Sequence, residues 1–328
     1  MFLRLFRSTG AQVIVFIPFL GVLLWVHSLL NIPHSQFLFD RVSMPLYKAV
    51  VGVLPPGTIH ASGFTLLLVI ILSFVLSRLN TRFMILNNRS YLPAIMFVMI
   101  TASYPGLQRL NPVIFAAFFL LFALNRIFKS YHRDRIAYEI FEAAFYISAG
   151  SLFYPFLIFF VFIVWVGLTV LRPFRWREWV FSILGLALPM FFMGSYYYLT
   201  IGEPLRLFYD FKAVFEAKYS FADYHVLFII FIGFVIVMMV LGSEFMLKEL
   251  QGKKIFPRKM FTVLLWLFIN VIAVYIAVPQ ASGELLILAS IPASFLLAHY
   301  LVFMESELWG NIFISVMLLL IVLIQIFY

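Results

Sequence analysis

The sequence predicts an all-α protein, a polytopic membrane helix bundle with about eleven transmembrane helices. Three observations predict it. Hydrophobic residues make up 64% of the 328 residues and charged residues only 11%, against about 45–50% and about 25% in a soluble domain. Long apolar runs follow one another along the whole chain, and Lys and Arg cluster at every second gap between them. Together these features predict one integral membrane domain over residues 1–328.

The basic clusters predict the orientation of the bundle. Lys and Arg in short loops near the ends of spans are retained on the cytoplasmic side during insertion. The N-terminus is therefore expected in the cytoplasm and the C-terminus in the periplasm of a bacterial inner membrane. The clusters are Arg4 and Arg7, followed by the predicted cytoplasmic loops 78–90, 126–135, 172–178 and 246–259.

The first two crossings are predicted at 11–30 and 61–79. The first run follows basic residues as a signal peptide does, but it has no small-x-small cleavage site and is long enough to span, so we expect it to be retained. The external loop 31–60 lies between them and contains an amphipathic stretch, 44–54.

Four crossings follow, at about 91–104, 112–128, 136–152 and 155–171. The first of these lies between Pro93 and Pro105. A helix of about a dozen residues is short for a full span at about 1.5 Å per residue. We expect a short helix here, of the half-helix kind that stands beside a water-filled cavity.

The seventh crossing, 178–199, has tryptophans at its basic end and Tyr196, Tyr197 and Tyr198 at the other, as interfacial aromatic belts require. The external loop 200–224 follows. Within 203–219, Leu207, Phe208, Phe211, Val214 and Phe215 share one helical face, and Arg206–Asp210 and Lys212–Glu216 are i,i+4 pairs. This pattern predicts a helix that lies in the external interface.

The last crossings are predicted at about 225–245, 260–278, 285–303 and 308–328. Pro292 interrupts the third of them, and no basic residue follows it. Ala289 and Ala293, with Ser290 and Ser294, have the small-xxx-small spacing that lets helices approach closely.

Several classes of function are excluded by what the chain lacks. It has no cysteine, no Gly-rich loop before a Lys, and no pair of histidines at i,i+4 around a Glu. These absences exclude disulfides, thiol and iron–sulfur chemistry, a P-loop and a zinc-hydrolase motif, and no metal site is predicted. The net charge of +9 lies largely in the cytoplasmic loops, so no nucleic-acid partner is expected.

Ionisable groups within the predicted spans cost a few kcal/mol each and need a reason. They are His27, Glu139, Glu142 and His299. Glu139 and Glu142 share a helix face and could form a proton or cation site, or Glu139 could pair with Arg135 at the interface. The histidines are either proton relays or neutral side chains bonded to neighbouring helices.

The external loops carry the candidates for chemistry. Asp40 could act as a general base, or hold a divalent cation against a lipid diphosphate if the protein transfers sugars. Candidate contacts to substrate or lipid phosphate are Arg41, Arg206, Asp210, Lys212, Asp223 and His225. The alternative is that all are ordinary solvated loop charges. On the cytoplasmic side, Arg172, Arg175 and Arg177 could bind a lipid headgroup, dock a partner, or simply anchor the topology.

The segments NPVIFAAFFLLFALNRIF and FEAAFYISAGSLFYPFLIFFVFIVWVGLTVLRPFRWREW, residues 111–128 and 141–179, resemble an uncharacterised family of multi-pass inner-membrane proteins from the Bacteroidota. The order of spans is also similar to that of GT-C integral-membrane glycosyltransferases and polysaccharide polymerases, which use polyprenyl-linked sugars. That resemblance implies a catalytic acidic residue in the first external loop, and Asp40 is the position that matches. GT-C enzymes often have an acidic pair there, which this loop lacks.

Three functions remain open from the sequence. The first is a GT-C-like enzyme or polymerase that uses polyprenyl-linked sugar at the outer face of the inner membrane. The second is a non-catalytic subunit or scaffold of an envelope secretion, motility or assembly complex. The third is a transporter, which would use broken helices near mid-membrane. The expected partners are membrane lipids, with either a polyprenyl-linked sugar or a membrane protein complex.

Overall fold

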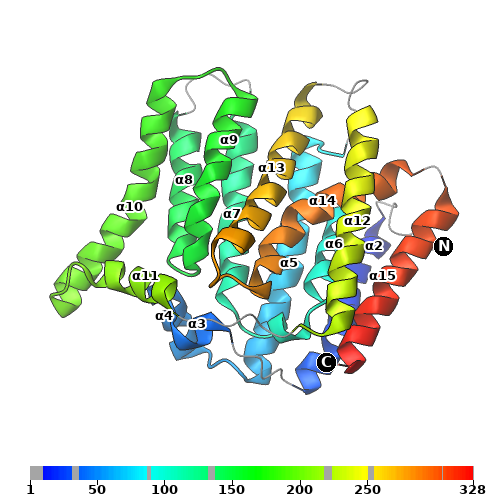
Figure 1. Ribbon diagram of the computed structural model, residues 1–328, viewed down its shortest axis with the longest axis horizontal. Coiled ribbons are helices and arrows are strands. Elements are labelled where there is room, and N and C mark those ends of the chain that lie inside the picture. The colour runs from blue at the N-terminus through cyan, green and yellow to red at the C-terminus, as the bar shows by residue number, and fades with distance from the viewer. Residues whose placement is uncertain are drawn as a thin grey trace.

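A computed structural model describes residues 10–31, 37–86, 90–131, 137–217, 224–249, 255–304 and 306–327. Within these ranges all regular structure is helical and no strand occurs. Most helices stand side by side along one direction and form a bundle (Figure 1). The predicted all-α class is therefore confirmed for the described part of the chain.

The helices begin and end close to the predicted crossings. The first half of the chain forms α2 (Ala11–Leu30), α3 (Leu38–Arg41), α4 (Pro45–Val53), α5 (Ile59–Phe83), α6 (Leu92–Thr101), η1 (Pro105–Leu107), α7 (Pro112–Lys129) and α8 (Ala137–Ser151). The second half forms η2 (Pro155–Phe160), α9 (Val161–Leu171), α10 (Trp176–Ile201), α11 (Arg206–Glu216), α12 (Val226–Glu249), α13 (Ile255–Ala277), η3 (Gly283–Leu285), α14 (Leu286–Phe303) and α15 (Glu307–Phe327).

Eight of the described helices are long and apolar enough to cross a membrane, namely α2, α5, α7, α10, α12, α13, α14 and α15. Their length and composition are those of transmembrane helices. Three other predicted crossings correspond to shorter elements: α6 has 10 residues, α8 has 15, and η2 continues into α9. The total of about eleven crossings stays a prediction.

Side-chain and backbone hydrogen bonds define several helix ends. Thr58 accepts a bond from the Ala61 N–H, 3.2 Å away, at the start of α5, and Asn111 does the same for Ile114 at the start of α7. Such caps satisfy N–H groups that have no partner within the helix. Gly202 ends α10 with a φ of 78°, a left-handed conformation that glycine adopts without steric cost.

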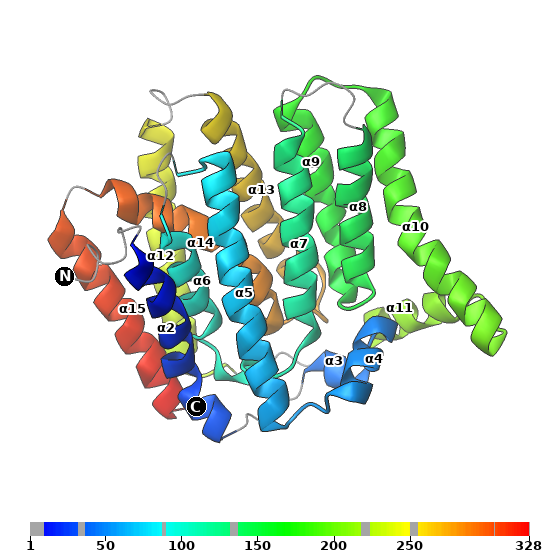
Figure 2. The same cartoon turned by 180° about the vertical axis from the view of Figure 1, so that it is seen from behind.

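Two groups of helices make up the bundle. In one, α7, α8, α9 and α10 pack together, and α10 contacts chiefly α8. In the other, α6 packs against α5 and α14, while α12 and α15 cover the outside. The helix α13 joins the groups because it packs on both α9 and α14. Figure 2 shows the first group with α10 at its outer edge.

The buried centre of the second group is formed by α6 and α14. All ten residues of α6 are buried, so packed side chains surround this short helix where we expected a water-filled cavity. The helix α14 crosses the bundle obliquely (Figure 1) and continues through Pro292. Ser290 and Ser294 of α14 are fully buried, and their hydroxyls bond to carbonyl groups of their own helix. Small residues at this spacing let helices approach closely, as the sequence predicted, and α14 packs extensively on α6.

The two ends of the bundle differ in structure and charge. The short helices α3, α4 and α11 lie at one end, where α15 also finishes (Figures 1 and 2). The α9–α10 turn, the last turns of α5 and α7, and the first turn of α13 lie at the other end. The described parts of the predicted cytoplasmic loops 78–90, 126–135 and 172–178 adjoin these helix ends. We refer to these as the amphipathic end and the basic end.

Candidate functional site

A groove lies between α12 and α13, with α14 as its floor. Its volume is about 510 Å³. The walls are apolar side chains such as Ile232 and Met239 of α12 and Val271 of α13. Ala289 and Ala293 form the floor, and their short side chains leave the space that a larger residue would fill. The volume falls within the range of about 300–1,000 Å³ that is typical of small-molecule sites.

The groove opens sideways, on the face of the bundle that would contact lipid. Ile229 on α12 is 57% exposed and Ile276 on α13 is 75% exposed at its edges. Both walls belong to helices that are long and apolar enough to span a membrane. A hydrocarbon chain could therefore enter this groove directly from the bilayer without passing through water.

One end of the groove is polar. Tyr224, just before α12, and Ser282 and Gly283, just before α14, line it together. The Gly283 N–H donates a 2.6 Å hydrogen bond to the Tyr224 hydroxyl. A Cβ at position 283 would lie only 2.8 Å from that oxygen, so the contact requires glycine. Burial raises the pKa of the Tyr224 phenol, and nearby Tyr275 and Glu284 act in the same direction. Tyr224 therefore remains a neutral hydroxyl group.

A buried carboxyl group stands directly behind this polar end. Glu284 is 1% exposed and accepts hydrogen bonds from the Ser282 hydroxyl and, over 3.3 Å, from the Tyr154 hydroxyl. Among the residues that the structure describes, no basic side chain forms an ion pair with Glu284. A buried carboxyl without hydrogen bonds would cost several kcal/mol, so these hydroxyl groups are what makes its position tolerable. We call Tyr154, Tyr224, Ser282 and Glu284 the Glu284 cluster.

The polar end of the groove connects to the amphipathic end of the bundle through α11. The Gln280 side chain donates a 2.6 Å hydrogen bond to the Phe215 carbonyl of α11, and Gln280 lies in the loop that leads to Ser282. The Tyr197 hydroxyl of α10 donates a 2.8 Å hydrogen bond to Asp210 of α11. Thus α11 is fixed to both α10 and the loop that carries the Glu284 cluster.

The pairs that we predicted on α11 are present. Arg206 lies 3.7 Å from Asp210, and Lys212 lies 3.6 Å from Glu216. The apolar face is narrower than expected, because Leu207 and Val214 are buried whereas Phe208 is 63% exposed. His225 is exposed just before α12, and Asp223 lies outside the described residues.

Asp40 does not line the groove. It forms an ion pair with Arg109 and accepts a 2.9 Å hydrogen bond from the Phe37 N–H at the start of α3. Arg109 is 8% exposed, and its guanidinium lies over the rings of Phe37 and Phe39, at 5.6 and 5.7 Å. These contacts tie α3 to the connection between α6 and α7 and favour a structural role for Asp40. Arg41, the next residue, is exposed.

The intramembrane carboxylates pair between neighbouring helices at the basic end. Glu142 of α8 lies 2.9 Å from Arg126 of α7, and Glu139 lies 3.4 Å from Lys129. The partner of Glu139 is therefore on α7, and Arg135, which we considered from the sequence, lies outside the described residues. These two ion pairs hold α7 against α8, and the described residues do not test the predicted Glu139–Arg135 pair.

The two candidate histidines lie in different settings. His27 is exposed near the end of α2. His299 is fully buried on α14 between the rings of Phe261 and Phe303, at 4.9 and 4.7 Å. Neither belongs to the groove lining. The third candidate group, Arg172, Arg175 and Arg177, lies at the α9–α10 turn, at the opposite end from α11 (Figure 1).

Comparison with known proteins identifies a family for this chain but assigns it no activity. Residues 42–328 match the model described as "Family of unknown function (DUF6427)". The chain belongs to this family. No curated protein and no solved structure matches the chain. The groove and the Glu284 cluster lie within the range matched by the DUF6427 model, whereas Asp40 and Arg41 precede it.

Sequence reasoning missed Glu284 and Arg109. The tenth crossing is predicted at about 285–303, which leaves Glu284 just outside it, whereas the Glu284 side chain is buried within the candidate span Gly283–Phe303. A lone Glu beside a long apolar run was the available signal. Arg109 lay in a short gap between apolar runs, and nothing nearby in the sequence indicated Asp40 as its partner.

Proposed function

We propose that this protein acts on a lipid-linked substrate of the polyprenyl-linked sugar class at the outer face of the bacterial cytoplasmic membrane. The hydrocarbon chain would lie in the groove between α12 and α13, and the head group would meet Tyr224 and Ser282. The observation that carries the proposal is the shape of this site, an apolar groove open to the bilayer with one polar end.

The polar end favours a specific ligand with a polar head group over non-specific occupation of the groove by bilayer lipid. Polar groups placed within a membrane bundle are costly and usually functional. The Glu284 cluster concentrates a carboxyl group and three hydroxyl groups where the groove ends. The Tyr224 hydroxyl accepts from the Gly283 N–H and keeps its own proton, which can be donated to an oxygen of a phosphate or sugar, while the apolar walls hold the chain.

The roles of individual residues follow from their contacts. Tyr224 and Ser282 line the groove and would touch the head group. Glu284 acts through Ser282, whose hydroxyl it holds, and is a positioning residue. The helix α11 and its bound loop would set the depth of the head group at the outer surface. If the reaction is sugar transfer, a divalent cation would be expected with the diphosphate.

The test is photocross-linking of a lipid analogue to the wild type and to a variant in which a large side chain fills the groove. Ala289→Trp places a large ring on the floor, and Ala187→Trp is a matched control on an exposed position of α10. Each protein would be purified in mild detergent with a photoreactive polyprenyl diphosphate, and cross-linked adducts counted by mass spectrometry. We expect the wild type and A187W to be labelled alike and A289W at least tenfold less. Equal labelling of all three proteins would contradict the proposal.

A second function, the scaffold subunit, is favoured by α10. Only 17% of the apolar window of this helix is buried, because it contacts chiefly α8. Phe191 and Phe192 are 67% and 60% exposed on it, a surface that suits either lipid or a partner helix. A stoichiometric membrane protein that copurifies with the wild type, and is lost when both residues are changed to Ala, would support this function. Purification without such a partner would count against it.

A further inference from the structure

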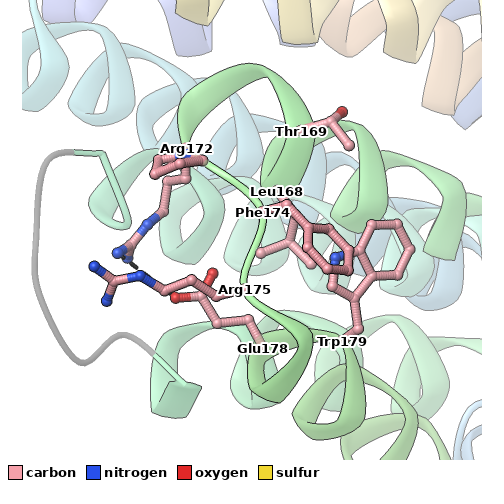
Figure 3. Close-up of a pocket in the computed structure, with 8 residues that line it drawn as sticks. Leu168, Thr169, Arg172, Phe174, Arg175, Glu178 and Trp179 are labelled. Atoms are coloured by element: carbon pink, nitrogen blue, oxygen red, sulfur yellow. Dashed lines mark ion pairs between the residues drawn. The ribbon is translucent and has the colours of Figure 1, made fainter.

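A second, smaller pocket lies at the α9–α10 turn, at the basic end of the bundle. Its volume is about 140 Å³. Arg172, Arg175 and Glu178 line it together with the rings of Phe174 and Trp179. Figure 3 shows the two arginine side chains extending to one side of the turn and the aromatic rings lying on the other. The pocket thus combines two cationic groups with an apolar wall.

Arg172 is unusually buried for a cation at the edge of a bundle. The residue is only 8% exposed. Its Nη2 lies 3.5 Å from Glu178, but its Nη1 is buried and has no hydrogen-bond acceptor within the described residues. Buried guanidinium groups normally have their donors satisfied, so an unused donor in a pocket calls for an acceptor.

The start of α10 adds to the positive potential. This helix has 26 residues. The residue at its N-cap position is Arg175, whose side chain accepts no hydrogen bond from the first N–H groups of the helix. Uncapped helix N-termini attract anions. Glu178 in the first turn opposes this effect, yet its carboxylate is already paired with Arg172. The unused Arg172 Nη1 donor therefore remains the group in this pocket that calls for an acceptor.

The position of the pocket relative to the membrane surface indicates which anion it binds. It opens where the candidate span Trp176–Ile201 begins. Phe174 and Trp176 are 75% and 67% exposed beside it, as aromatic residues are at the level of lipid head groups. Phosphate groups of membrane lipids lie at this level, and the apolar wall formed by Phe174 and Trp179 suits the glycerol and upper chain of such a lipid.

We propose that this pocket binds the phosphodiester group of an anionic membrane lipid, with the Arg172 Nη1 donating to a phosphate oxygen. The lipid occupies the leaflet at the basic end, so this site is separate from the groove and does not depend on its function. Its binding would hold the α9–α10 turn at a fixed depth in the membrane.

The test is lipid binding to the full chain in mild detergent, measured by native mass spectrometry with dioleoylphosphatidylglycerol. Dioleoylglycerol, which has the same chains and no phosphate, controls for binding by the tails. Three variants discriminate: Arg172→Gln removes the donor, Glu178→Gln removes the opposing charge, and Arg177→Gln removes an equal charge from an exposed position that does not line the pocket.

We expect one phosphatidylglycerol to bind wild type and R177Q alike, R172Q at least tenfold more weakly, and E178Q at least as tightly as the wild type. E178Q keeps Arg172, so the binding measured for E178Q does not depend on whether R172Q folds. We expect E178Q to retain binding. Equal losses in R172Q and R177Q would reveal a diffuse surface charge and overturn the proposal. Loss of binding in a folded E178Q protein would overturn it as well.

A second arm separates lipid from free phosphate. Inorganic phosphate is titrated against the bound phosphatidylglycerol at millimolar concentrations. We expect no displacement, because the chains contribute to binding. Full displacement by phosphate, or equal binding of dioleoylglycerol, would contradict the assignment of the site to a lipid phosphodiester.

Discussion

Tyr154, in the turn after α8, donates a hydrogen bond to Glu284, which lies 130 residues later in η3, directly before α14. This bond joins the helix group that contains α8 to the group that contains α14. It also holds the carboxyl group whose second partner, Ser282, lines the groove. The same contact therefore serves the stability of the bundle and the geometry of the candidate site.

The first prediction concerns this contact. Glu284→Ala leaves two buried hydroxyl groups without their acceptor, which should cost about 1–3 kcal/mol and lower the thermal midpoint measured in detergent. Tyr154→Phe should cost about 1 kcal/mol. Since the residues are in contact, the double variant should be less destabilised than the sum of the single variants. Strict additivity would show that the two side chains do not interact.

The second prediction concerns the close approach at Gly283. Gly283→Ala should lower the thermal midpoint because the new Cβ would meet the Tyr224 ring and hydroxyl at 2.8 to 2.9 Å. Tyr224→Ala should remove this penalty when combined with it. Gly233→Ala in α12 is the control, because its Cβ would have no neighbour within 4 Å. Equal thermal midpoints for G283A and G233A would contradict the close contact between Gly283 and Tyr224 at the end of the groove.

The third prediction separates a structural from a catalytic role for Asp40. Asp40→Ala should destabilise the protein by about 1.5–3 kcal/mol, the range for hydrogen bonds to charged groups, because Arg109 stays buried without its partner. Replacing both residues, as in D40A/R109M, should recover part of the loss. Thermal unfolding in detergent measures both effects. A D40A protein of unchanged stability that has lost function would instead favour a catalytic Asp40.

The fourth prediction is a pH dependence. The Tyr47 hydroxyl donates a 3.1 Å hydrogen bond to the Leu110 carbonyl. Burial raises the pKa of Tyr47 above its ordinary value, and Asp40 acts in the same direction. A raised pKa means that the neutral form is favoured by folding. This contribution is complete below the ordinary phenol pKa of about 10 and is lost as the pH rises above it.

Stability in detergent measured from pH 8 to 11 tests this prediction. The wild type should lose more stability than Tyr47→Phe on the alkaline side, although the variant starts lower because it lacks the hydrogen bond. Parallel curves for the two proteins would assign the alkaline loss to other groups.

The helices could be predicted from the sequence because apolar runs and turn residues act locally. The first helix, α2, has the bounds that the apolar run at 11–30 indicates, and α6 is short because Pro93 and Pro105 bracket it. The i,i+4 pairs of α11 were predictable for the same reason.

The site was not predictable in this way, because its contacts join distant parts of the chain. Nothing near Glu284 indicates that Tyr154 lies beside it, and nothing near Asp40 indicates Arg109. The groove depends on Ala289 and Ala293 facing the gap between α12 and α13. Their spacing predicted a close helix contact, but the packing of three helices determines which face of α14 remains open.

The complete burial of α6 constrains how the protein is made. Its neighbours include α14, which is synthesised only after some 180 further residues have left the ribosome, so for most of translation α6 lacks one wall of its final surroundings. A ten-residue apolar segment is too short to remain in the bilayer securely by itself. Other segments of the nascent chain must therefore pack against α6 until α14 has been synthesised. Chains that stop after α13 should be degraded rapidly in a pulse-chase experiment, whereas chains that stop after α14 should persist longer.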